Sequence, residues 1–261
     1  MKCGYCFNPI ILYYVKVGEN YYHQECYEKI ALRCSICKEI INGSYYETKH
    51  GHVCEKCYDP KICCFSCGRQ LQQNTMLRLG DCRVICANCN LTTVYQIENE
   101  HLDIIKKFFA LFGCSVKRGL FIQIVDYPQL CKLSTQKVRG TRLGICKTIF
   151  CKGGNFKTVT KHDIFILYGL PLGQYLGTLA HEMFHAWLNE NVRYNSRISD
   201  DDMEWLCESI ASEVLRNYIT DQFWCNYFRE SRENYQATTS LKNRLEFSHG
   251  SQIVSYVKML A

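Results

Sequence analysis

Residues 179–188 have the sequence Leu-Ala-His-Glu-Met-Phe-His-Ala-Trp-Leu. His181 and His185 are four residues apart, so on a helix both imidazoles lie on one face and can bind a single metal ion. Glu182 follows the first histidine and is the expected general base beside that ion. Apolar residues around the motif recur at helical spacing, which indicates a helix packed in the core. The sequence therefore predicts a catalytic zinc centre on a buried helix.

A third ligand is expected from the next helix along the chain. Ser199 precedes three consecutive aspartates, which is typical of a capped helix start. Glu204 and Glu208 lie one turn apart near the predicted buried side of this helix, and either could bind the metal. The glutamate that does not bind the metal would instead contact one of the metal ligands and fix its orientation.

The cysteines form a separate pattern. The chain has 19 cysteines, and thirteen of them fall within the first 89 residues. Most of these belong to pairs of pairs, with two residues inside each pair: Cys3, Cys6, His23 and Cys26; Cys34, Cys37, Cys54 and Cys57; Cys64, Cys67, Cys86 and Cys89. Zinc prefers four such ligands in tetrahedral geometry, and a closed four-ligand site is structural. Together with the histidine motif, the pattern predicts about four zinc ions per chain, three structural and one catalytic.

Two ligand positions have local competitors. Cys63 competes with Cys64, and either His50 or His52 competes with Cys54. Cys64 and Cys54 are preferred because each keeps two residues between the members of its pair. The spacers between pairs contain turn-like residues and are expected to form short antiparallel hairpins.

The sequence predicts two domains of α+β class. Residues 1–91 form the array of zinc-ribbon modules, and residues 92–261 form the second domain. Helical spacing predicts a connector helix over residues 92–112. The second domain is expected to combine a mixed sheet, the histidine helix and the glutamate helix. Its predicted strands are residues 120–126, 144–150 and 163–167.

Composition and charge exclude some classes of protein. Apolar residues make up 47% and charged residues 21% of the chain, which rules out a disordered protein. The net charge is +6, and residues 106–161 hold twelve basic residues and one acid. A solvated strand face explains this basic stretch better than nucleic acid, an acidic partner or a membrane surface, and no aromatic-basic RNA-binding motif is present. No charged-then-apolar leader opens the sequence and no apolar run approaches the ~18 residues of a membrane span, so we expect a cytoplasmic protein, with delivery into another cell left open.

Several segments together resemble the LIM peptidases related to the plant ubiquitin-activated regulators of organ size. They are residues 166–171 (ILYGLP), 179–188 (LAHEMFHAWL) and 204–208 (EWLCE), with residues 63–67 (CCFSC) upstream. The resemblance implies a cytosolic zinc endopeptidase with a gluzincin-type fold that cuts selected regulatory proteins. It implies that the LIM-like modules recruit substrates or partners, among them ubiquitin or ubiquitinated proteins. The first zinc unit resembles the second half of a LIM domain.

The resemblance also implies roles for individual residues. Gluzincin peptidases take their third ligand from a glutamate on the later helix, which favours Glu204 as ligand and Glu208 as its supporting partner. An extended substrate is expected to pair with an edge strand beside the active-site helix, and residues 163–167 are the candidate. Tyr168 or His249 is the candidate donor to the oxyanion.

Two functions from other classes remain as alternatives. One is a catalytically silent LIM scaffold, which has no need of a base at Glu182. The other is a zinc-rich nucleic-acid-binding protein, which would show steeply salt-dependent binding.

Overall fold

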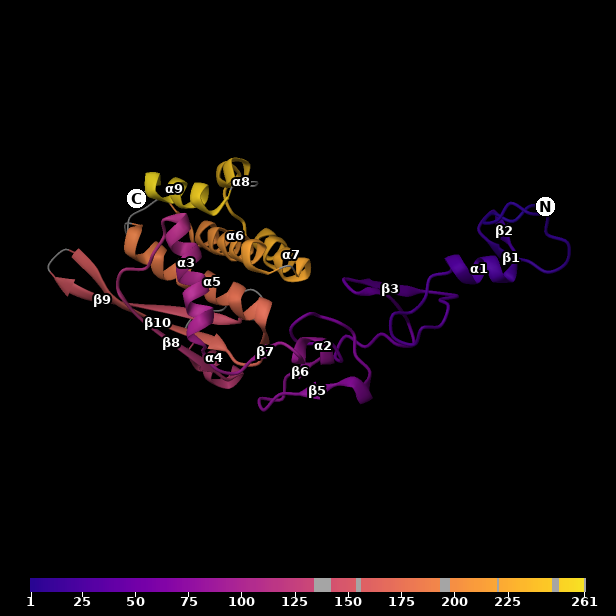
Figure 1. Ribbon diagram of the computed structural model, residues 1–261, viewed down its shortest axis with the longest axis horizontal. Coiled ribbons are helices and arrows are strands. Elements are labelled where there is room, and N and C mark those ends of the chain that lie inside the picture. Colours follow the sequence, from indigo (N-terminus) through magenta and orange to yellow (C-terminus); the bar gives the residue numbers. More distant parts are fainter. Residues whose placement is uncertain (134–141, 154–155, 193–197, 220, 246–248, 261) are drawn as a thin grey trace. The chain divides into compact units, whose positions relative to one another are not determined.

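The structure, a computed structural model, describes residues 1–133, 142–153, 156–192, 198–219, 221–245 and 249–260 (Figure 1). The chain divides into two compact units, residues 1–87 and residues 88–261. Parts of the basic stretch at residues 106–161, namely 134–141 and 154–155, lie outside the described residues. No helix among the described residues is long and apolar enough to cross a membrane.

The first unit consists of three small hairpins, each placed between two pairs of zinc-ligand candidates. The hairpins are β1 (Val15–Val17) with β2 (Asn20–Tyr22), β3 (Tyr45–Thr48) with β4 (Gly51–Cys54), and β5 (Leu77–Arg78) with β6 (Val84–Ile85), all antiparallel. Short helical segments complete this region: α1 (Gln24–Ile30), η1 (Gln73–Thr75) and α2 (Ala87–Asn90). The predicted hairpins are therefore present, and none is large enough to enclose a core.

The same turn follows the first cysteine pair of every module. The residue after each pair has a positive φ: Phe7 (61°), Lys38 (66°) and Gly68 (72°). Its amide donates a hydrogen bond to the carbonyl of the first cysteine, over 2.9 Å at Cys3, 3.0 Å at Cys34 and 2.9 Å at Cys64. Only glycine adopts this left-handed conformation without steric cost. The phenylalanine and the lysine are held there because the turn must bring two thiols to one point.

Few aliphatic side chains are buried in the first unit. Across residues 1–87 the buried ones are Ile10, Val53, Leu71, Leu79 and Ile85. Each module thus buries only one to three such side chains. Burial on this scale cannot offset the conformational entropy lost on folding, so another source of stability is required.

The second unit is built on a three-stranded mixed sheet with strand order β8-β10-β9. β8 (Gly119–Val125) is parallel to β10 (Phe156–Leu167), and β9 (Gly144–Gly153) is antiparallel to it. Helix α4 (Tyr127–Leu133) follows β8. The expectation that residues 163–167 form an edge strand is wrong, because they belong to β10 and are hydrogen-bonded on both sides. β9 is the edge strand of the β9–β10 hairpin.

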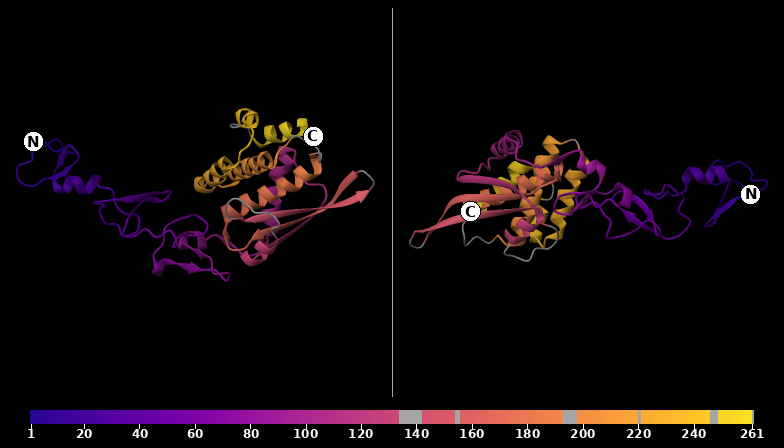
Figure 2. Two further views of the ribbon diagram at one scale, coloured as in Figure 1. Left: turned by 180° about the vertical axis from the view of Figure 1, so that it is seen from behind. Right: turned by 90° about the horizontal axis from the view of Figure 1, so that it is seen from below.

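Helices cover one face of this sheet in layers. α5 (Leu172–Asn191) packs on β9 and β10, α6 (Asp200–Tyr218) packs on α5, and α7 (Gln222–Ser231) packs on α6 (Figures 1 and 2). The last helices are η2 (Arg232–Asn234), α8 (Thr239–Leu245) and α9 (Gly250–Leu260). As expected, Ser199 caps α6, since its side chain accepts a hydrogen bond from the amide of Asp202. The two helices that carry the predicted catalytic residues are therefore direct neighbours.

The connector helix is shorter than predicted. α3 spans Asn99–Phe112, and Gly113 ends it with a φ of 76°. Before it, β7 (Thr93–Val94) pairs with β11 (Leu170–Pro171), immediately ahead of α5. The β-branched pair at the start of the predicted helix thus forms a strand that anchors the beginning of α5.

A buried hydrogen-bond network fixes the other end of α5. Nε2 of His162 lies 3.1 Å from Oε1 of Glu190, and Nδ1 of His162 lies 2.9 Å from Oγ1 of Thr148. The Glu190 carboxylate also accepts from the amides of Lys117 and Arg118, at 2.8 Å and 2.7 Å. The His162 side chain is fully buried. The network joins the last turn of α5 to β9, to β10 and to the residues that lead into β8.

Candidate metal centres

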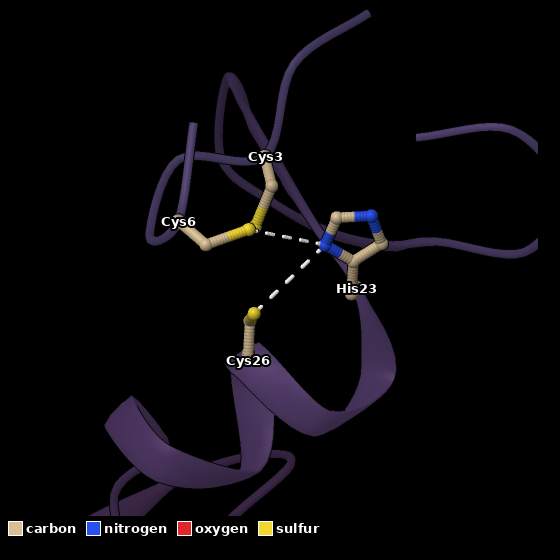
Figure 3. Close-up of side chains that lie close together, drawn as sticks. All are labelled: Cys3, Cys6, His23 and Cys26. Carbon is tan, nitrogen blue, oxygen red and sulfur yellow. Dashed lines mark hydrogen bonds between the residues drawn. The ribbon is translucent and has the colours of Figure 1, made fainter. Parts of the chain in front are cut away.

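The first predicted zinc site is assembled around His23. Cys3, Cys6, His23 and Cys26 offer ligand atoms that all lie within 4.8 Å of one another (Figure 3). Nδ1 of His23 lies 3.4 Å from Sγ of Cys6 and 3.8 Å from Sγ of Cys26. A tetrahedral zinc ion separates a nitrogen ligand from a sulfur ligand by about 3.5 Å, so the spacing fits zinc. Nε2 of His23 lies 3.2 Å from the carbonyl oxygen of Pro9, and donation to it leaves Nδ1 free to bind metal.

The other two thiolate sites have the same dimensions. The clusters are Cys34, Cys37, Cys54 and Cys57, and Cys64, Cys67, Cys86 and Cys89. Sγ atoms lie 4.0 Å apart in the Cys37–Cys54 pair and 3.8 Å apart in the Cys67–Cys86 pair. Zinc–sulfur bonds of about 2.3 Å place tetrahedral sulfurs about 3.8 Å apart. Both clusters are therefore compatible with zinc.

The structure separates the competing residues from these clusters. The thiol of Cys63 donates to the carbonyl of Asp59, 3.8 Å away. Nε2 of His50 lies 2.8 Å from the carbonyl oxygen of Cys67, and the ring of His52 packs edge-on against Tyr45. The clusters instead contain Cys64 and Cys54.

Backbone amides donate hydrogen bonds to the sulfur of Cys34. The amides of Ile36 and Cys54 each donate to Sγ of Cys34 over 3.4 Å. Burial raises the pKa of the Cys34 thiol, but these and other amides lower it more, to about 6. At Cys34 this favours the thiolate, which is the form that binds zinc, whereas burial raises the pKa of Cys57 in the same cluster to about 12.

The fourth site lies between α5 and α6. Nε2 of His181 lies 3.1 Å from Nε2 of His185. The Glu204 carboxylate reaches both rings, at 3.2 Å from Nε2 of His181 and 3.4 Å from Nε2 of His185. Bonds of about 2.0–2.1 Å around a tetrahedral zinc place such donor atoms about 3.4 Å apart. Two imidazoles and one carboxylate are also a ligand set of catalytic zinc sites, so these residues fit the ion that the sequence predicts.

Electrostatics within this group link the glutamate to the histidines. Burial raises the pKa of Glu204, but hydrogen bonds to His181 and His185 lower it well below its ordinary range. Burial lowers the pKa of each histidine, while Glu204 helps to raise both above the ordinary value. The side chain of Glu204 is 35% exposed, so the group opens to solvent on this side.

Glu208 faces the outer nitrogen of His181. Its Oε1 lies 3.8 Å from Nδ1 of His181 and accepts a hydrogen bond from Oγ of Ser231 over 3.0 Å. Burial raises the pKa of Glu208 to about 7. Glu204 therefore lies against the inner nitrogens of the histidine pair, and Glu208 lies against an outer nitrogen.

Glu182 lies at the boundary between α5 and the sheet. It is 6% exposed, and burial raises the pKa of its carboxyl group. Gly144, the first residue of β9, lies against it, and a Cβ atom there would come within 2.8 Å of the Glu182 carboxylate. The edge strand therefore begins beside the predicted base.

The two predicted oxyanion donors lie away from this group. Tyr168 precedes α5, and its ring lies 6.2 Å from that of Tyr95. Its position before α5 separates it from His181 by more than two helical turns. His249 is largely exposed and lies 3.4 Å from Glu213, which is about 13 Å along α6 from Glu204. Neither residue is brought to the metal ligands.

Two residues that the sequence did not single out do lie near the site. Tyr235 follows η2, and its pKa is raised first by burial and then by the charges of Glu204, Glu208, Cys207 and Glu182. The sequence carried no signal for Tyr235, because it comes from an irregular segment. Cys207 offers its Sγ within 4.8 Å of the ligand atoms of His181 and His185. Cys207 could have been identified from the sequence, because it follows Glu204 by three residues and so lies on the same face of the predicted helix.

Comparison with known proteins gives two family matches. The model of the DA1-like family, described as "Protein DA1", matches residues 120–259, which is more than half of the chain. The LIM domain model matches residues 3–62. This match covers the first two zinc modules together, so the expectation that the first module is the second half of a LIM domain is wrong. The prediction of a LIM-type zinc-binding region followed by a mixed α and β unit is confirmed.

Relatives from Arabidopsis thaliana match across both regions. "Protein DA1-related 7" is 28% identical over 255 residues, covering 82% of this chain and 44% of that protein. "Protein DA1" is 25% identical over 257 residues, covering 82% of this chain and 48% of that protein. "Protein DA1-related 3" is 24% identical over 263 residues, covering 82% of this chain and 56% of that protein. The chain thus spans about half the length of the curated relatives it matches.

Proposed function

Because the chain belongs to the DA1-like family, we propose that it is a zinc-dependent endopeptidase that uses its LIM-type region to bind substrates or partner proteins. One observation carries this proposal. Nε2 of His181, Nε2 of His185 and the Glu204 carboxylate meet at 3.1–3.4 Å between two packed helices, with the carboxylate of Glu182 on the residue that follows His181.

The proposed mechanism assigns a task to each of these side chains. His181, His185 and Glu204 would hold the ion, with Glu208 orienting His181 from its outer nitrogen. A bound zinc ion supplies Lewis acidity that activates water and stabilises negative charge on a substrate carbonyl oxygen. Glu182 would take a proton from the attacking water on its carboxylate and deliver it to the leaving amine. Its raised pKa suits both steps, since a base and an acid are required in turn.

Two further features suit a peptide substrate. β9 is an edge strand whose first residue lies against Glu182, so a peptide in extended form could pair with it and pass the base. β9 thus takes the substrate-binding role that was first expected of residues 163–167. Tyr235 replaces Tyr168 and His249 as the proposed oxyanion donor, because its segment is hydrogen-bonded to the start of α6, the helix that carries Glu204.

The first unit suits a binding role. Its three closed sites leave no coordination position for chemistry, whereas several large side chains on the first module are strongly exposed: Phe7, Ile11, Leu12 and Tyr13. Exposed apolar groups of this kind favour contact with another protein. Ubiquitin or ubiquitinated proteins are the partner class that family resemblance suggests. Eleven cysteines of the zinc modules are proposed metal ligands, and because metal binding requires reduced thiols we propose a reducing compartment such as the cytoplasm.

The test compares the wild type with Glu182→Gln on candidate protein substrates, with bound metal measured in both. We expect about four zinc ions per chain in each protein and cleavage by the wild type alone. Cleavage by both proteins would refute the role of Glu182. Three zinc ions and no cleavage by the wild type would favour the silent scaffold instead.

A further inference from the structure

Cys207 occupies an unusual position for a buried thiol. It lies on α6 and is 0% exposed. Its Sγ lies within 4.8 Å of the ligand atoms of both His181 and His185. Glu204 precedes it by three residues, so the two side chains leave the helix on the same face. Cysteine sulfur and glutamate oxygen therefore approach the histidine pair from one helix.

A packing role alone explains this position poorly. A free cysteine usually behaves as a small apolar side chain and is buried among apolar neighbours. The Sγ of Cys207 instead lies among polar groups, because it and the ligand nitrogens of His181 and His185 are all within 4.8 Å of one another. Cys225 on α7 is buried as well, and the charges it meets come from surface residues. Among the described cysteines of the second unit, Cys207 is the one whose Sγ groups with the ligand atoms of both His181 and His185.

We propose that Cys207 is a reversible fourth protein ligand of the metal held by His181, His185 and Glu204, and that it keeps part of the peptidase population latent. This inference rests on the proposed function. On coordination the thiol loses its proton to solvent, and an S–metal bond replaces the S–H bond. A site with four protein ligands is closed in the same way as a structural zinc site and has no position for water. Release of the sulfur, with return of a proton to it, would open the site.

The spacing allows a thiolate from Cys207 to bind the same ion as the two histidines. A tetrahedral zinc ion places a thiolate sulfur about 3.5 Å from an imidazole nitrogen, which lies inside the 4.8 Å limit met by Sγ of Cys207 and the two rings. Soft thiolate ligands also strengthen binding of zinc relative to hard cations. While its sulfur is bound, Cys207 would therefore hold the ion firmly and block hydrolysis, and molecules with the sulfur released would account for the activity of the wild type.

The test observes the metal itself. The full chain is loaded with ¹¹³Cd²⁺, whose nuclear resonance moves downfield with each added thiolate ligand. His181→Ala identifies the resonance of the second-unit site, because that variant loses it. We expect this resonance to shift upfield in Cys207→Ser and in Cys207→Ala, and to stay in place in Cys225→Ser, the buried control. We also expect both Cys207 variants to cleave substrate faster than the wild type.

The outcomes separate this inference from the proposed function. A second-unit resonance that keeps its position in both Cys207 variants would overturn the role of Cys207 and leave the metal centre intact. If His181→Ala removed no resonance, the second unit would hold no metal, and the proposed function would fail together with the inference.

Discussion

A Cβ atom at Gly144 would lie 2.8 Å from Oε1 of Glu182. It would also lie 2.9 Å from Cγ2 of Thr178, one turn earlier on α5. Both separations are shorter than ordinary contacts, so the edge strand can approach the helix this closely only with glycine here. The position of the predicted base thus depends on a residue that has no side chain.

Gly144→Ala should reduce peptide cleavage at least tenfold without loss of metal, because the added methyl group displaces the Glu182 carboxylate. Cleavage rate and zinc content measured on the same sample would show this. Gly43→Ala is the matched control, since a Cβ at Gly43 has no neighbour within 4 Å. Equal cleavage by both variants would mean that Gly144 does not position the base.

Glu204→Gln should lower the bound metal by about one ion per chain, because an amide binds zinc far less well than a carboxylate. Glu208→Gln should keep that ion, since Glu208 faces the outer nitrogen of His181 at 3.8 Å. Elemental analysis of the purified proteins measures both. Glu213→Gln, also buried on α6, is the control. If Glu208→Gln lost the ion and Glu204→Gln kept it, Glu208 would be the metal ligand and Glu204 the supporting residue.

Removal of metal should unfold the first unit and spare the second. The first unit buries few aliphatic side chains, so metal binding, worth about 10–16 kcal/mol in zinc-finger peptides, supplies most of its stability. Hydrogen exchange after strong chelation should show protection lost over residues 1–87 and kept in α5 and α6. Persistent protection of residues 1–87 in metal-free protein would contradict this account.

Glu190→Ala should lower the free energy of unfolding by about 2–3 kcal/mol, because it leaves Nε2 of the buried His162 and two backbone amides without their acceptor. Denaturant titration of the second-unit transition measures the change. Asp103→Ala removes an exposed acid from α3 and should change stability by less than about 0.5 kcal/mol. Similar small effects from both variants would show that the network around His162 contributes little to the free energy of unfolding.

Local patterns were sufficient to predict most of the residues that the structure gathers into candidate metal sites. The spacing of a cysteine pair sets the geometry of one tight turn, and the spacing of His181 and His185 sets one helix face, so both could be predicted without knowledge of the fold. The choice between Glu204 and Glu208 was harder. Both lie on the buried side of α6, and only the packing of α6 on α5 determines which carboxylate meets the inner nitrogens.

Features that depend on contacts between distant parts of the chain were not predicted from the sequence. The segment that carries Tyr235 is held against the start of α6 by two amides: Gln236 donates to Asp201 over 3.1 Å, and Thr238 donates to Asp202 over 2.8 Å. No periodicity marks such contacts. The central place of β10 did have a signal, since Ile164–Leu167 is a continuous apolar run, as is typical of a strand enclosed on both faces.

On the proposed function, the edge position of β9 would limit which parts of a target protein can be cut. A peptide that pairs with β9 must offer free amide and carbonyl groups, whereas a folded segment already uses these groups in its own helices and sheets. Cleavage would therefore fall in disordered linkers or in regions that open by local unfolding. Selection among targets would then depend on tethering through the zinc modules, which raises the effective concentration of a bound target, more than on residue preference at the cleaved bond.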